Sequence, residues 1–173
     1  MEGKKIVDSE MDMTLDMDLV KGAGGSVYWF TTISDIPKQF FSNYVKDKRF
    51  LDLGCGDGRV VAHALRCGAK VFRGIDNDDT FLKKSSMQRY IKKGNFLDIE
   101  FNQYDVLYYF LLSDNKNELK LIKRLKDFQG IIIVYHRKVS HKLKDFHEGI
   151  EKQGFIEIEN IEYLRVYKKG VKK

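Results

Sequence analysis

The sequence contains little proline and cysteine and has no long apolar run. Its 173 residues include one proline, Pro37, and two cysteines, Cys55 and Cys67. Two cysteines without a CxxC pair exclude a disulfide framework and favour a reducing compartment. The longest apolar runs, VLYYFLL and IIIVY, are far shorter than the ~20 residues of a membrane-spanning helix. Because the acidic N-terminus also lacks the regions of a secretory signal, we expect a cytoplasmic protein without a membrane partner.

The composition is that of a globular domain, with 43% hydrophobic and 32% charged residues. The formal net charge is +6, but the charge is unevenly distributed. Residues 1–20 hold six acidic residues and two lysines, a net charge of −4, which leaves +10 for residues 21–173. A basic body attracts nucleic acid, acidic protein surfaces or anionic small molecules, so RNA is one candidate partner.

The length suits one domain with a substantial core. We expect an acidic N-terminal segment at residues 1–26 and a single domain at residues 27–173, with a monomer favoured. From Met11 to Leu19 the apolar residues occupy odd positions, a period of two that is typical of an edge strand. A mobile tail explains the same stretch equally well, since it is terminal and precedes the glycine-rich KGAGGS.

Beyond Lys48 the pattern alternates between strand and helix. This alternation predicts an α/β fold, namely a doubly wound, Rossmann-like and mostly parallel seven-stranded sheet with helices on both faces. Two strand-like runs at the C-terminus have no helix between them and predict an antiparallel hairpin. The expected strands are 49–53, 70–75, 89–93, 105–109, 130–135, 155–159 and 163–168, and the expected helices are 38–46, 58–67, 79–87, 116–126 and 140–153.

A glycine-rich loop follows the first of these strands in the segment RFLDLGCGDGRVVAHAL. Alternate glycines, Gly54, Gly56 and Gly58, let a backbone turn tightly and approach a ligand beside a helix N-terminus. The loop is not a P-loop, and the dinucleotide motif GxGxxG would need glycine where Arg59 stands. Because acidic residues flank and enter the loop, a cationic or zwitterionic ligand fits it better than a pyrophosphate.

The next two strands also end in polar residues. The second ends in GIDND, where Asp76 can accept both hydroxyls of a ribose, and the third runs into GNFLD, where Asn95 and the backbone of Phe96 can bracket an adenine. Open α/β sheets bind ligands at this carboxyl edge, near the point where the strand order reverses. The three motifs therefore predict one nucleoside-binding site.

With these motifs in order, the chain resembles the class I (seven-strand) S-adenosylmethionine-dependent methyltransferases. LDLGCGDGR matches the first motif of that family, GIDND the second, GNFLD the third and YDVLYY the fourth strand. The resemblance implies the cofactor S-adenosyl-L-methionine and the product S-adenosyl-L-homocysteine. The chain departs from the family in one respect: the stretch between Asp76 and the third strand is short, so we expect the helix there to be truncated and the adenine pocket to be more open than usual. The cofactor-binding residues that the resemblance implies are Asp52, Gly54, Cys55, Gly56 and Gly58 in the loop, Asp76 and Asn77 after the second strand, and Asn95 and Phe96 after the third.

The stretch after the fourth strand bears on the methyl acceptor. Methyltransferases that act on adenine or glutamine carry an (N/D)PP(Y/F) tetrad there, whereas this chain has FLLS. Small archaeal protein-lysine methyltransferases and their mitochondrial relatives similarly have an FLL stretch, a Tyr-x-Pro-Thr-like segment before the first helix and a Ser-His pair ending strand five. This chain has YWFTT and Tyr135-His136 in those places, without the prolines and the serine. The resemblance implies lysine methylation, with Tyr28, Trp29, Tyr109 and His136 as the catalytic candidates.

Two other functions remain open. An RNA methyltransferase would use the basic body, although no separate RNA-binding motif is present. A protein that binds the cofactor without transferring a methyl group is the other alternative. Because His136, His141 and His147 are scattered over a strand end and a helix, we expect no metal site.

Overall fold

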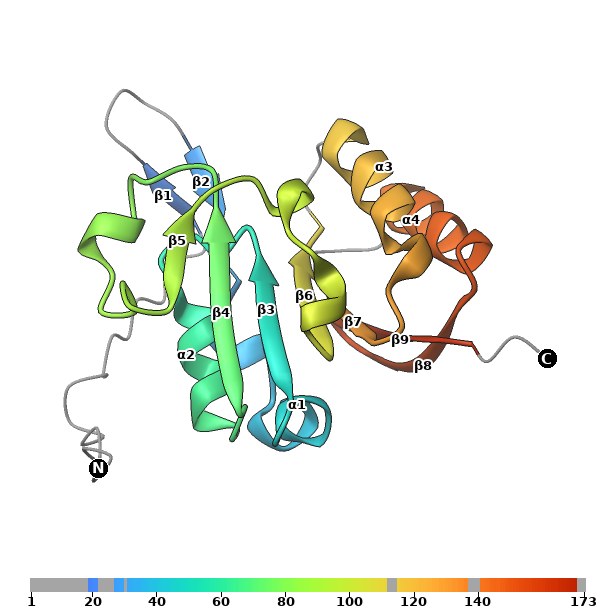
Figure 1. Ribbon diagram of the computed structural model, residues 1–173, viewed down its shortest axis with the longest axis horizontal. Helices are drawn as coiled ribbons and strands as arrows, with labels where there is room; N and C mark the ends of the chain where they lie inside the picture. Colours follow the sequence, from blue (N-terminus) through green and yellow to red (C-terminus); the bar gives the residue numbers. More distant parts are fainter. Residues whose placement is uncertain (1–18, 22–26, 30, 112–114, 137–140, 171–173) are drawn as a thin grey trace.

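A seven-stranded mixed sheet forms the centre of the protein (Figure 1). The structure is a computed structural model and describes residues 19–21, 27–29, 31–111, 115–136 and 141–170. The strand order is β5-β4-β3-β6-β7-β9-β8, with β3 to β7 parallel and β9 antiparallel to both of its neighbours. This arrangement confirms the predicted fold. The strands of this sheet are β3 (Arg49–Leu53), β4 (Val71–Asp76), β5 (Ile91–Lys93), β6 (Val106–Phe110), β7 (Ile131–Tyr135), β8 (Phe155–Ile161) and β9 (Leu164–Lys169).

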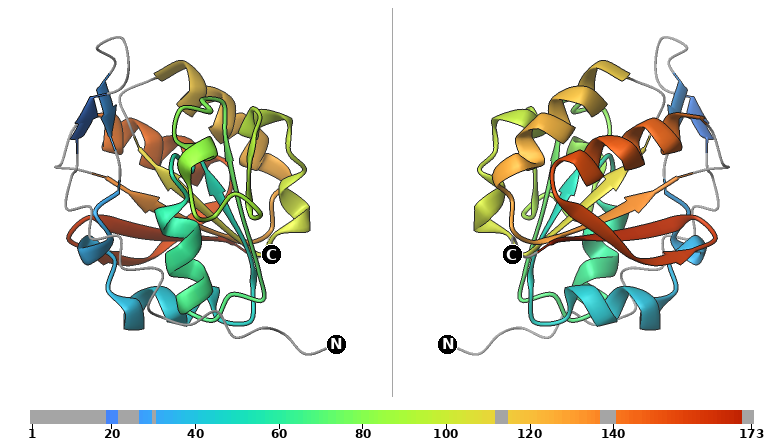
Figure 2. Two further views of the ribbon diagram at one scale, coloured as in Figure 1. Left: turned by 90° about the vertical axis from the view of Figure 1, so that its left-hand side faces the viewer. Right: turned by 90° about the vertical axis from the view of Figure 1, so that its right-hand side faces the viewer.

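Helices cover both faces of the sheet (Figure 2). Helices α1 (Lys38–Val45) and α2 (Arg59–Arg66) contribute to one apolar cluster, and α3 (Asn115–Arg124) and α4 (His141–Lys152) contribute to the other. Successive residues of a strand point to opposite faces. Tyr108 accordingly belongs to the α1/α2 cluster and Tyr109 to the α3/α4 cluster. The central strands are buried on both faces, which explains why IIIVY is continuously apolar.

A second, two-stranded sheet pairs β1 (Leu19–Lys21) with β2 (Val27–Trp29) in antiparallel register. This pairing joins residues 19–21, which belong to the N-terminal segment expected at residues 1–26, to residues 27–29 of the expected domain. The strand predicted from Met11 falls outside the described residues up to position 18, and Leu19 begins β1.

The segment between β2 and α1 is fastened to the central strands by two tyrosine hydroxyls. Tyr135 on β7 donates to the Asp35 carboxylate at 2.6 Å, and the Tyr108 hydroxyl on β6 lies 2.8 Å from Thr31 Oγ1. Both tyrosines are almost completely buried. Because a buried hydroxyl needs a partner, these two pairs fix residues 31–36 against the sheet.

The helix predicted at residues 79–87 is wrong, because only one 3-10 turn, Leu82–Lys84, forms there. Polar side chains bind the backbone in place of helical hydrogen bonds. Asp78 Oδ1 accepts the Thr80 N–H at 2.8 Å, and Ser85 Oγ accepts the Met87 N–H at 2.9 Å. Short polar side chains compete with helix formation in this way. The other helices and strands predicted beyond residue 37 are present, with ends that differ by at most two residues.

Candidate functional site

The glycine loop turns from β3 into α2 with a left-handed backbone. The φ angles of Gly54, Gly56 and Gly58 are 83°, 50° and 81°, a region that side chains with a Cβ rarely adopt. The N–H groups of Gly54 and Cys55 donate to the carbonyl of Ile75 at 2.8 and 3.1 Å. The loop is therefore bonded directly to the carboxyl end of β4, as the predicted cofactor site requires.

Asp76 ends β4 and is held by two backbone amides. The N–H of Gly56 donates to its Oδ2 at 2.8 Å, and the N–H of Asp78 donates to its Oδ1 at 2.9 Å. Each carboxylate oxygen has capacity for a further hydrogen bond. The half-buried Asp76 carboxylate thus lies against the loop and can still accept hydrogen bonds from the two hydroxyls of a diol. Asn77, the next residue, is exposed.

Asp52 lies on the adjacent strand and is buried, with 2% of its surface exposed. Burial raises the pKa of this carboxyl well above its usual value, and the nearby charges of Asp76 and Asp57 raise it further. The negative charges of Asp76 and Asp57 thus oppose the ionisation of Asp52 beside the glycine loop. Such an arrangement is relieved by a positive charge, which a cationic ligand would supply.

Cys55 contributes its backbone to the loop and turns its side chain into the protein. Burial raises the pKa of the thiol, so it stays protonated and is a poor nucleophile. A Cβ built on Gly74 would lie 2.6 Å from the Cys55 Cβ, so only glycine lets β4 approach the loop this closely. Gly74 therefore supports the site, and the sequence gives no spacing signal for it.

The adenine candidates lie after β5, next to Asp76. The Gly94 N–H donates to the Asp76 carbonyl at 2.8 Å, which brings this turn to the end of β4. Asn95 is exposed and uses its Oδ1 to accept the N–H of Leu97 at 3.0 Å, while its amide nitrogen can act only as a donor. Phe96 is half-buried, and its ring meets Tyr109 edge to face at 6.0 Å.

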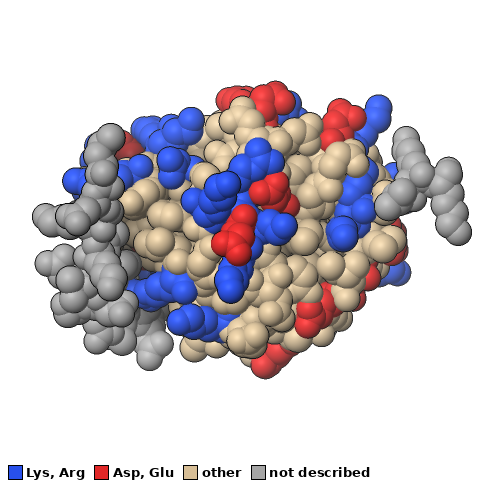
Figure 3. Space-filling view, turned by 60° about the horizontal axis from the view of Figure 1, so that its bottom comes forward, with Lys and Arg blue, Asp and Glu red and all other residues tan. Residues whose placement is uncertain are grey.

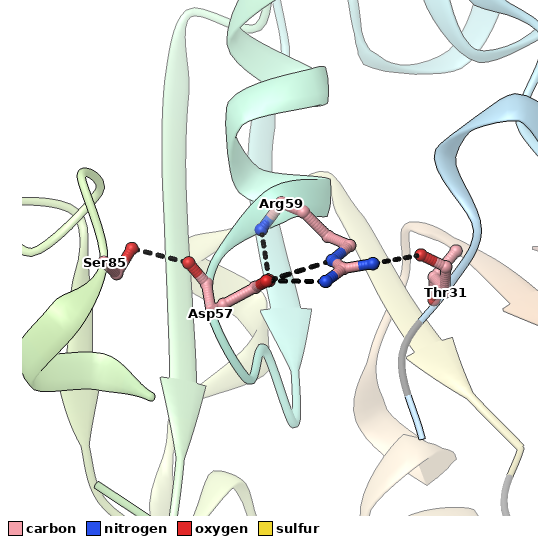
Figure 4. A network of polar contacts seen from close by, with 4 residues as sticks. All are labelled: Thr31, Asp57, Arg59 and Ser85. Atoms are coloured by element: carbon pink, nitrogen blue, oxygen red, sulfur yellow. Dashed lines mark hydrogen bonds and ion pairs between the residues drawn. The ribbon is translucent and has the colours of Figure 1, made fainter. Parts of the chain in front are cut away.

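A polar network surrounds the far end of the loop (Figure 4). Asp57 and Arg59 form an ion pair in which Nη2 lies 2.8 Å from Oδ2 and Nε lies 3.1 Å from Oδ1. Arg59 Nη1 also donates to the Thr31 carbonyl at 3.5 Å, and Ser85 Oγ donates to the Asp57 carbonyl at 2.5 Å. The sequence indicated only that Arg59 replaces a glycine, and its contact with Thr31 was missed.

The acceptor candidates lie at the carboxyl ends of β6 and β7. Tyr109 is only 6% exposed, and its ring stacks on Phe146 of α4 with centroids 5.9 Å apart. Phe110, the last residue of β6, is half-buried against the ring of Tyr135. Tyr28 and Trp29 lie on β2, the strand that leads into the segment fastened by Tyr108.

His136 directly follows β7 and is 3% exposed. Neither of its ring nitrogens has a hydrogen-bond partner within the described part of the chain. Burial lowers the pKa of its imidazole, and the Arg165 charge lowers it further, while Glu157 raises it. The ring is therefore neutral near pH 7, with one nitrogen able to accept a proton.

The described residues contain neither a metal-ligand cluster nor a membrane-spanning helix. No group of three or more His, Cys, Asp or Glu side chains is arranged to hold a metal ion within those residues. Among the helices of the described ranges, none is both long and apolar enough to cross a membrane.

Solved methyltransferase structures share this fold. A ribosomal protein L11 methylase from Lactobacillus delbrueckii subsp. bulgaricus has a TM-score of 0.59 at 16% identity, over 77% of this chain and 77% of that chain. An RNA methyltransferase from Salinibacter ruber, in complex with S-adenosyl-L-homocysteine, has a TM-score of 0.57 at 16% identity, over 82% of this chain and 92% of that chain. An S-adenosylmethionine-dependent methyltransferase from Mesorhizobium loti has a TM-score of 0.57 at 11% identity, over 78% and 99%. No family model and no curated protein matches the sequence. The chain therefore has the fold of the class I methyltransferases.

Proposed function

We propose that the protein is an S-adenosylmethionine-dependent methyltransferase. The observation that carries this proposal is the pair of acidic side chains Asp52 and Asp76 beside a left-handed glycine loop, since Asp57 is already paired with Arg59. S-adenosylmethionine carries a positive sulfonium and an ammonium group and so offsets the mutual repulsion of these acids, which a pyrophosphate would increase. The shared fold supports the same function.

In this proposal each part of the site binds one part of the cofactor. Asp76 accepts hydrogen bonds from the ribose hydroxyls, and Asp52 with the backbone of Gly54 and Gly56 holds the methionine part. Asn95 and Phe96 contact the adenine. When bound, the cofactor supplies an electrophilic methyl group and leaves as S-adenosylhomocysteine. The protein's own task is then to align the acceptor and exclude water, which requires neither a metal nor a covalent nucleophile.

For the acceptor we propose a protein lysine side chain. A lysine ammonium, with a reference pKa of about 10.4, must lose a proton before its nitrogen can attack. In this proposal His136, whose ring nitrogens have no partner among the described residues, accepts that proton at one nitrogen or passes it to water. Phe110 and the β2 residues Tyr28 and Trp29 would provide aromatic surface for the cation. We assign Tyr109 the role of orienting the amine.

RNA is the second candidate acceptor. It is favoured by the charge of +10 on residues 21–173 and by the RNA methyltransferase among the structures of the same fold. Figure 3 shows Lys and Arg side chains in several groups on one face, with Asp and Glu side chains among them. This one face carries no continuous basic stripe, and we place lysine first on the residues that follow the fourth strand and on His136.

A labelling experiment tests the proposal. The protein is incubated with tritiated S-adenosylmethionine and a cell extract, and portions are then treated with nuclease or with protease. We expect the label to remain in macromolecules after nuclease treatment and to be released by protease. Release of the label by nuclease alone would show that RNA, and not a protein lysine, is the methyl acceptor. Cofactor binding without any transfer would favour the third alternative, a binding protein.

A further inference from the structure

Arg59 contacts two segments that are 26 residues apart in the sequence. Its guanidinium makes two bonds to the Asp57 carboxylate, and its backbone N–H donates to Asp57 Oδ1 at 3.1 Å. The side chains of Arg59 and Asp57 are only 14% and 18% exposed. A bidentate, largely buried ion pair holds the guanidinium in one orientation. That orientation directs Nη1 at the carbonyl of Thr31.

Thr31 is held from two sides. Arg59 reaches its carbonyl from the start of α2, while the Tyr108 hydroxyl reaches its Oγ1 from β6. Thr31 is itself buried, with 4% of its surface exposed. Thr31 lies two residues after β2, the strand that carries Tyr28 and Trp29.

Asp57 is also bonded on its other side. Ser85, in the segment that replaces the predicted helix, donates to the Asp57 carbonyl at 2.5 Å. The residue at the tip of the glycine loop therefore joins three segments: the loop, the Ser85 turn and, through Arg59, residues 31–36. The Arg59–Thr31 bond, at 3.5 Å, is longer than the bonds to Asp57. It is the contact most able to change when the loop is filled.

We propose that Arg59 is a positioning residue that couples occupancy of the glycine loop to the order of residues 31–36. This inference rests on the proposed function, because it takes S-adenosylmethionine as the ligand of the loop. A ligand that fixes Asp57 fixes the guanidinium and thereby strengthens its hold on the Thr31 carbonyl. Residues 31–36, which Tyr108 and Tyr135 already hold against the sheet, are then held more firmly when the methyl donor is present.

Hydrogen exchange tests the coupling without requiring turnover. Amide exchange of residues 31–36 is measured with and without S-adenosylhomocysteine in the wild type and in Arg59→Lys. Lysine keeps the charge but cannot bond Asp57 and Thr31 with one planar group. We expect the ligand to slow exchange at least about threefold in the wild type and less than twofold in Arg59→Lys, as the loss of one hydrogen bond implies.

Arg49→Lys is the matched control. Arg49 forms a similar bidentate ion pair with Asp105, in which Nη2 lies 2.7 Å from Oδ1 and the backbone N–H of Arg49 donates to the same carboxylate. This pair lies at the amino end of β3, away from the glycine loop. This variant should behave as the wild type. If Arg59→Lys fails to fold, Asp57→Asn provides a second variant, because it weakens the same ion pair at constant size.

The outcomes separate the inference from the function on which it rests. If the wild type does not bind S-adenosylhomocysteine, the proposed function fails. If the ligand binds but leaves exchange of residues 31–36 unchanged, or slows it equally in wild type and Arg59→Lys, the coupling is wrong while the function stands. In turnover, Arg59→Lys should raise KM for the acceptor more than about threefold and leave the cofactor Kd within about twofold. Equal increases in the KM for the acceptor and in the Kd of the cofactor would indicate a purely structural role for Arg59.

Discussion

The Asp76 carboxylate accepts the backbone N–H of Gly56 at 2.8 Å. This bond connects the end of β4 to the middle of the glycine loop, which are 20 residues apart in the sequence. A second amide, from Asp78, holds the other carboxylate oxygen. Because both oxygens are already oriented, a ribose would meet a carboxylate that loses little freedom on binding, which favours affinity.

Replacing this carboxylate should weaken cofactor binding. We expect Asp76→Ala to raise the Kd of S-adenosylhomocysteine about 10- to 100-fold, because hydrogen bonds to a charged group contribute roughly 1.5–3 kcal/mol. Isothermal calorimetry measures this directly, and circular dichroism checks that the variant folds. An unchanged Kd in a folded Asp76→Ala protein would remove Asp76 from the ribose site.

Two glycines of equal backbone strain should differ in their effect on binding. The φ angles of Gly54 and Gly68 are 83° and 86°, so alanine at either position should cost about 1–2 kcal/mol of stability. A Cβ on Gly54 would meet no atom within 4 Å and would project into the space assigned to the cofactor, whereas Gly68 lies beside Lys46, after α2. We expect Gly54→Ala to lose S-adenosylhomocysteine binding and Gly68→Ala to keep it. Equal affinities, measured together with the unfolding free energies, would contradict the loop assignment.

Tyr109→Phe should separate chemistry from cofactor binding. The variant keeps the ring that stacks on Phe146 and loses only the hydroxyl that we assign to orienting the amine. We expect kcat to fall about tenfold or more, with the cofactor Kd unchanged. Steady-state kinetics with the labelled acceptor provides the measurement, and wild-type turnover would exclude Tyr109 from the reaction.

The buried His63 makes stability depend on pH. Burial and, to a lesser extent, the charge of Arg66 lower the pKa of its imidazole from 6.5 to about 4. Because the unfolded chain takes up the proton first as the pH falls, this contribution to stability is complete above pH 6.5 and is lost towards pH 4. The loss should reach about 3 kcal/mol in that interval.

His63→Gln isolates this contribution, since the other titrating groups remain. The free energy of unfolding of the variant should approach that of the wild type as the pH is lowered from 7 to about 4. Denaturant titrations at several pH values measure the difference. A difference that stays constant with pH would show that His63 does not titrate as described.

Much of the fold could be predicted because local patterns and the sheet agree. IIIVY predicts a buried parallel strand, and the close spacing of the last two strands predicts their antiparallel pairing; both are confirmed. The helix at residues 79–87 could not be predicted correctly. Its sequence spacing allows a helix, but the Asp78 and Ser85 side chains bind the backbone instead.

The site was predictable to the extent that it follows strand ends. Asp52, one residue before the end of β3, and Asp76, the last residue of β4, lie at the carboxyl ends of neighbouring parallel strands, as expected. The contact of Arg59 with Thr31 joins two segments that are far apart in the sequence, which no local pattern encodes. The alternation in β6 likewise predicts that Tyr108 and Tyr109 face opposite sides, but only the packed helices decide which hydroxyl reaches Thr31.

Equilibrium dialysis with tritiated S-adenosylmethionine tests the central claim most directly. The account predicts saturable binding at one site per chain, competition by unlabelled S-adenosylhomocysteine and a large loss of binding in Asp76→Ala. Absence of saturable binding by the folded wild-type protein, or binding that Asp76→Ala leaves intact, would contradict the account.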